Sequence, residues 1–507
     1  MKLEDLPYIH NLGQAFRRIV SLYPDKIAIQ FSPQEKYSFH DLNLLSNQWA
    51  QYLKESNIQE QDVVAILNEK SLSSFALMVA CLKIGVIYTN LDASSPKARL
   101  NKIIERCNPK IVFSDIGSSI PDLIFDGPIV DYSEIAIDEY SKEDHTSEIN
   151  GSCAAYIMFT SGSTGFPKGA VISHSNLLHF IQWGRTTYSV SPDDIFTNAN
   201  PIYFDNSVFD FYVSIFNGAS VVPLSHQLVK DARALVSAIE QNQCTFWFSV
   251  PSLLVYLLTT RVLTSNSFPE IKRIAFGGEG FPKNKLLQLY QMFSQRTSIY
   301  NVYGPTECTC ICSSHQVCDD DFQNMNELTT LGKLAPNFGY EIIPLDDNSE
   351  IGELCLMGPC VGLGYYNDEE RTNGSFISNG SPFKTWSYRT GDLVERVESG
   401  FLYFRGRVDN QIKHMGYRIE LEEIEAAYAG LVEVDEVGVV YQRLTAELGQ
   451  IVAFIKLNDA AVDTDSIVIK IKEILPQYMI PRVQRVLEEL PKNQNGKIDR
   501  NRLKELL

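Results

Sequence analysis

The chain has 507 residues, of which 44% are hydrophobic and 21% are charged, an ordinary globular composition with enough length for two or more domains. Its formal net charge of −18 at pH 7 disfavours nonspecific binding to nucleic acid. No apolar run approaches the roughly 20 residues that span a bilayer, and residues 1–7 lack the apolar core of a signal peptide. We therefore expect a cytoplasmic protein that binds neither nucleic acid nor a membrane.

Segments with strand and helix periodicity alternate along most of the chain, a pattern that favours a parallel α/β sheet covered by helices. Residues 116–150 are an exception, because they are turn-rich and acidic and predict surface loops. Short strands over residues 352–358 and 362–366 indicate a compact β subregion. The other predicted helices are residues 11–23, 38–56 with Ser38 as N-cap, a segment up to Lys83, 421–430 and 467–475, and the other predicted strands are residues 26–31, 63–67, 85–92, 245–250, 271–276, 434–441 and 451–457.

The stretch from Ala154 to Gly169 combines a buried strand with a polar loop. A run of apolar residues breaks into glycine, serine and threonine and closes with Lys168. Glycines let backbone N–H groups turn toward an anion, hydroxyls add donors, and the lysine adds positive charge, so the composition suits a triphosphate. The register differs from that of a P-loop. A flexible serine–glycine surface loop is the alternative interpretation.

The ten cysteines are scattered and form no Cys-x-x-Cys pair, which argues against a zinc site. Reduced and mostly buried thiols are expected. The alternate spacing of Cys308, Cys310 and Cys312 predicts that they share one face of an extended segment. Two single residues also stand out. Asp205 is a lone carboxylate in an aromatic stretch, and His174 follows Ser173, a possible helix cap, where it could face a ligand or simply pack.

Several strings in the sequence resemble, in the same order, the motifs of one enzyme superfamily. They are residues 154–169, Asn301–Glu307, Tyr388–Leu393, Phe404–Glu420 and Pro491–Arg500. They resemble the adenylate-forming superfamily, which contains acyl-CoA synthetases, luciferases and the adenylation domains of nonribosomal peptide synthesis. The resemblance implies an α/β fold with a large, multi-subdomain N-terminal domain of layered sheets and helices (1–408). A small, mobile α+β C-terminal domain (409–507) would follow, hinged at Asp409.

The resemblance also implies ATP and Mg²⁺ as cofactors and assigns roles to single residues. Lys497 would be catalytic, between the substrate carboxylate and the α-phosphate, and Glu307 would hold the metal. Tyr303 would stack on adenine, Asn301 would contact its amino group, and Asp392 would bind the ribose hydroxyls from a tight turn. The complete expected ATP site is Thr160, Ser161, Gly162, Ser163, Thr164, Gly165, Lys168, Gly278, Asn301, Tyr303, Gly304, Thr306, Asp392 and Arg407.

Asp205 matches the position at which amino-acid-activating members carry an aspartate for the substrate ammonium. A zwitterion that enters an apolar pocket needs such a counter-charge. The expected substrate pocket is Asp205, Asn206, Phe209, Phe248, Ala275, Gly277, Val302, Cys310 and Ile311. It holds no second charge, and two phenylalanines should narrow it, so we expect a small apolar amino acid, with proline ahead of alanine or valine.

The chain is similar to freestanding prolyl- and D-alanyl-carrier protein ligases. D-alanine ligases typically carry cysteine where this chain has Gly277, which argues against D-alanine. The resemblance implies formation of an aminoacyl adenylate and transfer to the phosphopantetheine thiol of a carrier protein. Because only seven residues follow Arg500, we expect that carrier in trans. An acyl- or aryl-CoA synthetase, an inactive scaffold and a nucleotide-binding regulatory protein are the alternatives.

Overall fold

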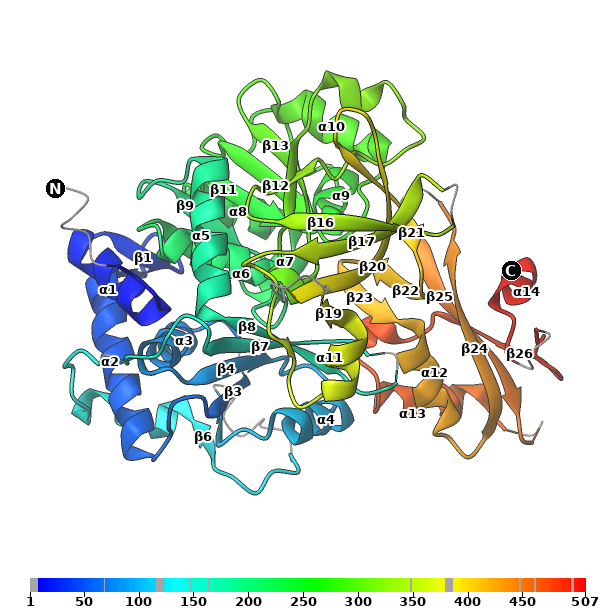
Figure 1. Ribbon diagram of the computed structural model, residues 1–507, viewed down its shortest axis with the longest axis horizontal. Helices are drawn as coiled ribbons and strands as arrows, with labels where there is room; N and C mark the ends of the chain where they lie inside the picture. The colour runs from blue at the N-terminus through cyan, green and yellow to red at the C-terminus, as the bar shows by residue number, and fades with distance from the viewer. Residues whose placement is uncertain are drawn as a thin grey trace.

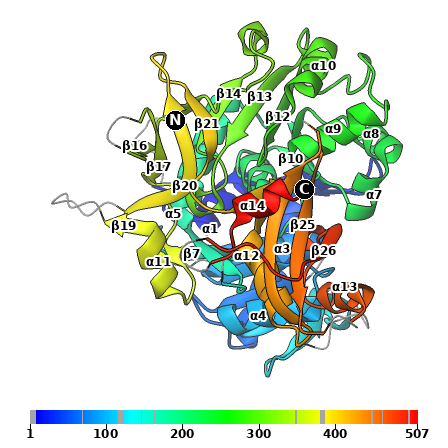
Figure 2. The same ribbon diagram turned by 90° about the vertical axis from the view of Figure 1, so that its right-hand side faces the viewer.

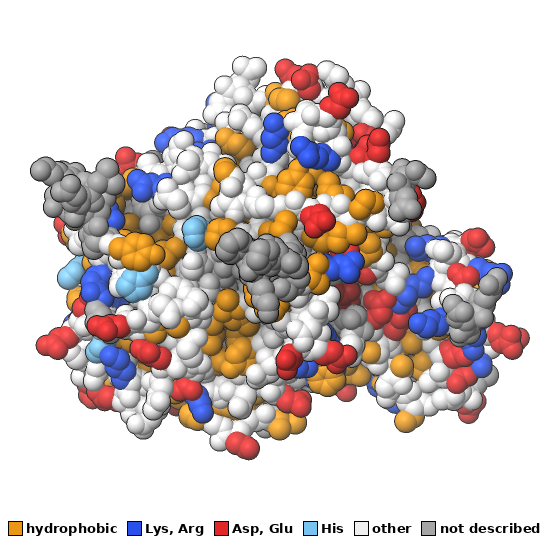
Figure 3. All heavy atoms as spheres, in the orientation of Figure 1, with side chains coloured by type: hydrophobic (Ala, Val, Ile, Leu, Met, Phe, Trp, Pro, Cys, Tyr) orange, Lys and Arg blue, Asp and Glu red, His pale blue; other side chains and the backbone are white. Residues whose placement is uncertain are grey.

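The computed structural model describes residues 8–67, 69–114, 123–145, 147–162, 164–346, 349–378, 386–445, 448–459, 462–493 and 497–507. The α/β prediction is confirmed: two large sheets flanked by helices and a smaller β subregion form the body of the molecule, and a small C-terminal unit lies on one side of it (Figure 1). Basic and acidic side chains are mixed on the face in Figure 3, where no broad patch of one sign covers the described surface.

One large sheet carries, between Thr160 and Lys168, the loop that the sequence predicted to hold a triphosphate, and we call it the phosphate loop. Among the described residues its strand order is β18-β8-β7-β4-β3-β5-β6. Strands β7, β4, β3, β5 and β6 run parallel, and β8 returns antiparallel to β7. Every residue of β3 is buried, as expected for a central parallel strand. The strands are β3 (Val63–Leu67), β4 (Ile87–Leu91), β5 (Ile111–Ser114), β6 (Ile129–Asp131), β7 (Ala154–Thr160), β8 (Lys168–Ser173) and β18 (Gly364–Tyr365).

Two sequence predictions for this sheet are wrong. Residues 129–131, predicted as surface loop, form β6 and pair with β5, because the short apolar pair Ile129 and Val130 packs at the sheet edge. Residues 364–365 were expected in the β subregion but pair with β8 instead. The intervening residues 115–122 and 146 lie outside the described part of the chain.

The second large sheet supplies the other wall of the site. In the described chain its strand order is β15-β14-β13-β12-β11-β9-β10-β1-β2, and the strands from β13 to β1 run parallel. The strands are β1 (Ile27–Gln30), β2 (Lys36–Ser38), β9 (Ile195–Asn198), β10 (Ser220–Pro223), β11 (Phe246–Ser249), β12 (Arg273–Gly277), β13 (Ser298–Tyr303), β14 (Ser313–Gln316) and β15 (Lys333–Leu334).

Helices cover both sheets, and their ends follow the predicted capping signals. Ser38 and Ser173 each form a capping box at the start of a helix, as the sequence predicted. The helices of this body are α1 (Leu12–Leu22), α2 (Phe39–Glu55), α3 (Leu72–Ile84), α4 (Lys97–Cys107), α5 (His174–Tyr188), α6 (Asn206–Val208), α7 (His226–Lys230), α8 (Ala232–Gln241), α9 (Pro251–Thr259) and α10 (Lys283–Phe293), with a π-helical turn η5 (Phe209–Val213) and 3₁₀ turns η3 (Tyr132–Glu134), η4 (Ile137–Glu139), η6 (Thr306–Cys308) and η7 (Asp319–Phe322).

The β subregion joins the body to the C-terminal unit. Within the described residues it has the order β16-β17-β20-β19, with β21 on the far side of β20. Its long strand β20 carries Asp392 and pairs with β21, which carries Arg407. The elements are β16 (Gly339–Pro344), β17 (Ile351–Met357), α11 (Glu369–Ser375), β19 (Phe376–Ser378), β20 (Trp386–Arg396) and β21 (Leu402–Arg407).

The C-terminal unit has apolar cores of its own. Two clusters of buried side chains are built only from residues 419–503. Figure 2 shows its sheet, ordered β24-β25-β26, in front of the larger body, and the β22–β23 hairpin points into that body. The elements are β22 (Gln411–His414), β23 (Tyr417–Glu420), α12 (Leu421–Ala429), β24 (Val434–Arg443), β25 (Gly449–Leu457), α13 (Thr464–Lys472), η8 (Gln477–Met479), β26 (Val483–Val486) and α14 (Arg500–Glu505).

Ser173 links the phosphate-loop sheet to α5 and gives a stability prediction. Its hydroxyl accepts from the backbone N–H of Asn176, at 3.1 Å, in a buried setting. We expect Ser173→Ala to lower the free energy of unfolding by about 1 kcal/mol, because the N–H loses its partner. The urea midpoint measures this effect. Ser175→Ala, in the first turn of the same helix, is the control, and an equal loss in both variants would contradict the capping role.

Candidate active site

A cavity of about 470 Å³ lies where the two large sheets meet the β22–β23 hairpin. It is reached by the carboxyl ends of the parallel strands, the usual place for a ligand in an open α/β sheet. Thr160 Oγ1 and Asn90 Oδ1 belong to residues that line it, and both atoms are buried without a hydrogen-bond partner in the described structure. The predicted site residues that line it are Thr160, Ser161, Asp205, Asn206, Phe248, Gly277, Gly278, Val302, Tyr303, Gly304, Thr306, Cys310, Ile311, Asp392 and Arg407.

Asp205 lines this cavity together with the apolar side chains of Phe248, Val302 and Ile311, and we call this part of the cavity its apolar end. Its Oδ2 accepts a hydrogen bond from the Thr306 hydroxyl. Burial raises the pKa of Asp205, and the Thr306 bond and the charge of Arg418 offset only part of that effect. Because burial disfavours the charged form of Asp205, a cation bound beside it would stabilise that form. The ammonium group of an amino acid is such a cation.

The walls near Asp205 differ in part from the expected pocket. Phe248 lines the cavity, whereas Phe209 packs behind it with ring centroids 5.1 Å apart. Ala275 is fully buried and does not reach the cavity surface. A Cβ at Gly277 would lie 2.5 Å from the carbonyl oxygen of Val302. A side chain at position 277 therefore requires the neighbouring strand to move.

The prediction that the three cysteines lie on an extended segment is wrong. Thr306–Cys308 is a 3₁₀ turn, and Thr309 and Cys310 follow with φ of 59° and 73°. Such left-handed backbone is strained for residues with a Cβ. The turn reverses the chain between β13 and β14. All four residues from this stretch, Cys308, Cys310, Ile311 and Cys312, are buried, but only Cys310 and Ile311 line the cavity.

The phosphate loop is in contact with the C-terminal unit. The backbone N–H of Gly162 donates to Glu423 Oε2 at 3.0 Å, and Ser161 Oγ donates to the carbonyl oxygen of Arg418 at 2.8 Å. Glycine is needed at 162, because a Cβ there would lie 2.1 Å from the Phe166 carbonyl oxygen. Arg371 donates to the Thr164 hydroxyl.

Basic side chains surround the loop on its other sides. Lys102 donates to the Gly165 carbonyl oxygen at 2.7 Å, and Arg99 pairs with Glu423. Lys168 lies 3.7 Å from Glu307 and 3.5 Å from Glu420. The loop is thus a basic site inside an acidic protein. Ser163, which was also expected in the ATP site, lies outside the described residues.

Glu307, the expected metal ligand, is fully buried and already paired. Its Oε1 accepts from the Tyr365 hydroxyl at 2.7 Å, and its Oε2 pairs with Arg418 at 2.8 Å. Burial alone would raise the pKa of Glu307, but Arg418 and Lys168 outweigh it and hold the pKa below its ordinary value. Mg²⁺ prefers oxygen ligands with room for water. In this arrangement a guanidinium fills that place, so the residues present do not fit the metal.

The expected nucleotide contacts cluster beside a second cavity of about 520 Å³. Tyr303 donates to Asp392 at 2.6 Å, and Lys413 lies 5.6 Å from the Tyr303 ring centroid. Asn301 donates to the Thr330 carbonyl oxygen at 2.8 Å and lines this second cavity.

Asp392 lies in a setting that differs from the prediction. It sits inside strand β20 rather than in a tight turn, where Gly391, with φ of 71°, accompanies a bulge. Its other oxygen pairs with Arg407. Both carboxylate oxygens of Asp392 therefore already have partners.

Lys497 is not brought to the site. It is exposed and does not line the 470 Å³ cavity. Its backbone N–H donates to Asn493 Oδ1 at 3.1 Å. The hairpin residues Lys413, Gly416 and Arg418 line the cavity instead.

Comparison with known proteins identifies the family. The model of the AMP-binding enzyme family matches residues 16–366, and that of the AMP-binding enzyme C-terminal domain matches residues 423–497. The chain belongs to the AMP-binding enzyme family. The predicted membership of the adenylate-forming superfamily is confirmed, and so is the prediction of an AMP-forming ligase.

Similar proteins cover nearly the whole chain. A D-alanine–D-alanyl carrier protein ligase of Bacillus licheniformis is 30% identical over 98% of this chain and 99% of its own. An L-proline–[L-prolyl-carrier protein] ligase of Streptomyces coelicolor is 30% identical over 87% of each. The structure of the Vibrio cholerae adenylation domain AlmE with glycyl-adenosine-5'-phosphate has a TM-score of 0.82 at 23% identity, covers 100% of this chain and 99% of that one, and supports the fold.

Several charged residues of this AMP-binding enzyme were not singled out by the sequence. Arg418, Glu420 and Glu423 contact the loop and Glu307, and Arg99 pairs with Glu423. Arg418 and Glu420 belong to the string Phe404–Glu420, which marked the region but not its partners. Arg418 and Glu420 lie two residues apart on a short strand, and this spacing could have indicated that both side chains point to the same face of it.

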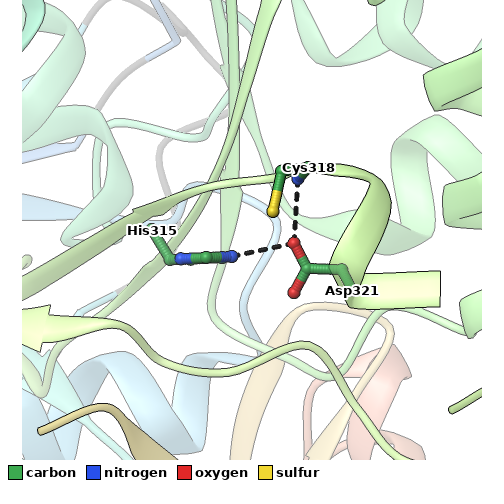
Figure 4. A group of neighbouring side chains, drawn as sticks. All are labelled: His315, Cys318 and Asp321. Carbon is green, nitrogen blue, oxygen red and sulfur yellow. Dashed lines mark hydrogen bonds and ion pairs between the residues drawn. The ribbon is translucent and has the colours of Figure 1, made fainter. Parts of the chain in front are cut away.

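A separate cluster of possible metal ligands is explained by capping. His315, Cys318 and Asp321 lie together at η7 (Figure 4). Asp321 Oδ2 takes hydrogen bonds from His315, at 2.8 Å, and from the Cys318 N–H, at 2.9 Å. The Lys283 ammonium donates to the Asp321 carbonyl oxygen at 2.6 Å, and this nearby positive charge disfavours a cation.

No helix among the described residues is long and apolar enough to span a bilayer.

His174 packs inside the protein and does not line the cavity. Its burial leads us to expect that the stability of the fold depends on pH. It is fully buried, and its Nδ1 accepts from the Leu12 N–H at 3.1 Å. Burial lowers its pKa from 6.5 to about 4. Since the unfolded chain then binds the proton more readily, stability is present above pH 6.5 and is lost as pH falls toward 4. We expect a loss of about 2 kcal/mol between pH 7 and 5 from this group.

Urea unfolding at both pH values measures the effect. His174→Gln keeps an acceptor without titrating, so its stability should depend less on pH by that amount. His179→Gln, on the exposed side of α5, should keep the wild-type dependence. An unchanged dependence in His174→Gln would contradict the assignment.

Proposed function

We propose that this ligase activates a small, mainly apolar amino acid with ATP and passes the aminoacyl group to the phosphopantetheine thiol of a separate carrier protein. The observation that carries the proposal is Asp205. It is a half-buried carboxylate with a raised pKa, and it lines the same cavity as Phe248, Val302 and Ile311. A carboxylic acid without an amine would add no positive charge beside Asp205, which would then keep only the partial compensation from Arg418 and Thr306.

In the first half-reaction the substrate carboxylate attacks the α-phosphorus of ATP, and pyrophosphate leaves. The chain contributes positioning and charge neutralisation. Thr160 and Ser161 lie at the cavity, and Lys102, Lys168 and Arg371 surround the loop that would hold the phosphates. Mg²⁺ stays a prediction, and no step is assigned to it because Glu307 is paired in this arrangement.

The second half-reaction requires a thiol to reach the acyl carbon. We propose that the small domain (409–507) turns about Asp409 relative to residues 1–408, bringing Lys497 to the cavity for adenylation and withdrawing it for transfer. The present arrangement supports the transfer orientation, because Lys497 is exposed and the β22–β23 hairpin lines the cavity. The carrier ligases among the similar proteins support a carrier protein as the acceptor.

Proline is the favoured substrate, ahead of alanine or valine. Apart from Asp205, the predicted pocket residues at this end of the cavity carry no charge, and Phe248 limits its width. Gly277 leaves no room for the cysteine of D-alanine ligases unless Val302 moves. An acyl- or aryl-CoA synthetase is the second candidate, since such enzymes share the fold.

ATP–pyrophosphate exchange with the common amino acids and D-alanine tests the proposal. We expect exchange with proline or another small apolar amino acid. Asp205→Asn should lower it about 100-fold or more, because the ammonium loses its counter-charge. Lys497→Ala should abolish exchange, and the exposed Asp193→Asn is the control. Activity with simple carboxylic acids but with no amino acid would favour the CoA synthetase.

The pocket wall gives a second prediction. Phe248→Ala should open space beside Asp205 and shift the ratio of kcat/KM for leucine over proline upward by about tenfold or more, since one or two methylenes are worth 1–3 kcal/mol. The same exchange assay measures the ratio. If the ratio does not change, Phe248 does not bound the side-chain pocket.

A further inference from the structure

Two cationic side chains, each from a different helix of the body, hold the tip of the phosphate loop. Lys102 on α4 donates to the Gly165 carbonyl oxygen at 2.7 Å, and its ammonium lies 4.9 Å from the centre of the Phe166 ring. Arg371 on α11 donates to the Thr164 hydroxyl, and its Nη1 also donates to the Phe166 carbonyl oxygen at 3.3 Å. The backbone that follows Thr164 is therefore fixed, and Thr164 itself is tied to a guanidinium.

Asp368 holds the Arg371 side chain in this position. It is the N-cap of α11, where its Oδ1 accepts from the Arg371 backbone N–H at 3.2 Å. Its Oδ2 pairs with Arg371 Nη1 at 3.1 Å, and the two side chains are only 11% and 17% exposed, so salt screens this pair less than a pair in open solvent. The guanidinium is thus directed at the loop before a ligand arrives, which reduces the ordering cost of binding.

The bond from Arg371 determines what the Thr164 hydroxyl can do. A guanidinium only donates hydrogen bonds, so the Thr164 oxygen is the acceptor and its own proton remains available for a second partner. Thr164 is exposed, and in the described part of the chain no acceptor takes that proton. A phosphate oxygen is an acceptor, and a hydroxyl that already accepts from a charged donor is polarised toward donating. Arg371 therefore makes Thr164 a donor for an anion.

The place of Thr164 in the loop selects the terminal phosphates of ATP. In the proposed first half-reaction the substrate carboxylate attacks the α-phosphorus, which must then lie in the 470 Å³ cavity beside the amino acid. Thr160 and Ser161 line that cavity, whereas Thr164 lies farther along the loop and does not. Its hydroxyl is therefore placed for the part of ATP that leaves as pyrophosphate.

We propose that Arg371 is a positioning residue for the first half-reaction, and that it acts through the Thr164 hydroxyl on the terminal phosphates of ATP. It contributes to the binding of ATP and of pyrophosphate but not to the binding of AMP. This inference rests on the proposed phosphate-binding role of the loop. It depends neither on the identity of the amino acid or the carrier nor on a cation at Glu307.

Calorimetric titration of the full-length protein with ATP, AMP and inorganic pyrophosphate tests this role. Mg²⁺ is kept at one concentration throughout, so that any contribution of the metal is common to all variants. Arg371→Gln should bind ATP and pyrophosphate about tenfold more weakly than the wild type, because a charge-assisted hydrogen bond is lost beside the terminal phosphates. Its affinity for AMP should stay at the wild-type value, which also shows that the variant is folded.

A double-mutant cycle separates an action through Thr164 from a general effect of charge. Thr164→Val alone should weaken ATP binding about tenfold, and adding it to Arg371→Gln should cost less than about twofold more, because the two residues act as one unit. Arg106→Gln is the matched control. Its guanidinium pairs with the same Asp368, at 3.4 Å, and donates to the Asn367 carbonyl oxygen rather than to the loop, so its affinity for ATP should stay at the wild-type value.

The outcomes separate the inference from the proposed function. The inference is wrong if Arg371→Gln binds ATP as tightly as the wild type, if it loses ATP and AMP affinity equally, or if the losses in the double variant are additive. If the wild type binds none of the three ligands, the phosphate-binding role of the loop is wrong and the inference falls with it. Amino-acid-dependent exchange of ATP with pyrophosphate tests the proposed function separately: its absence for every amino acid, together with the selective loss of ATP affinity, would overturn that function and support the inference.

Discussion

A carboxylate without access to water needs a cation beside it, and Glu307 places this constraint at the centre of the molecule. Its partners come from different parts of the chain: Lys168 from β8, Tyr365 from β18 and Arg418 from the small domain. The surrounding contacts between the body and the small domain include a hydrogen bond from the Gly416 N–H to Glu279 at 3.0 Å and one edge-to-face ring contact, between Phe204 and Tyr417. Ionic partners can be exchanged for a ligand of the same charge, which an interlocked apolar surface would not allow.

The independence of the small domain follows from where its apolar side chains lie. Its two clusters of buried residues are complete within 419–503. The change of orientation that we propose for it would therefore expose neither cluster. The body, in contrast, has one large cluster that runs through both sheets and the β subregion. The two parts are therefore distinguished by their separate clusters of buried side chains.

The sequence predicted the regular elements well, because their periodicity and caps are local. The boundaries of α1, α2, β3 and β4 fall within a residue or two of the prediction. Errors came where pairing at a distance decides the structure. Strand β6 is too short to show a strand periodicity in the sequence. Strand β18 pairs with β8, which lies nearly two hundred residues earlier in the sequence, and Asp392 lies in a strand rather than in a turn. The turn at Thr309 and Cys310 was also missed, since left-handed backbone at non-glycine residues has no signature in the sequence.

The site shows a different limit of sequence reasoning. Sequence motifs mark all residues expected to take part in the reaction, whatever the orientation of the small domain. One structure shows a single orientation, so it brings only some of these residues together. Residues of the body that were expected in the site, such as Asp205 and Tyr303, line one cavity together. Lys497 and the segment 418–423 belong to the same small domain, yet Lys497 is exposed while Arg418 is at Glu307. If a rigid domain presents both to one cavity, it can do so only by turns. The separation of Lys497 from the other expected residues agrees with the two orientations proposed for the small domain, and the charged groups that contact the loop and Glu307 are those that the motifs did not assign.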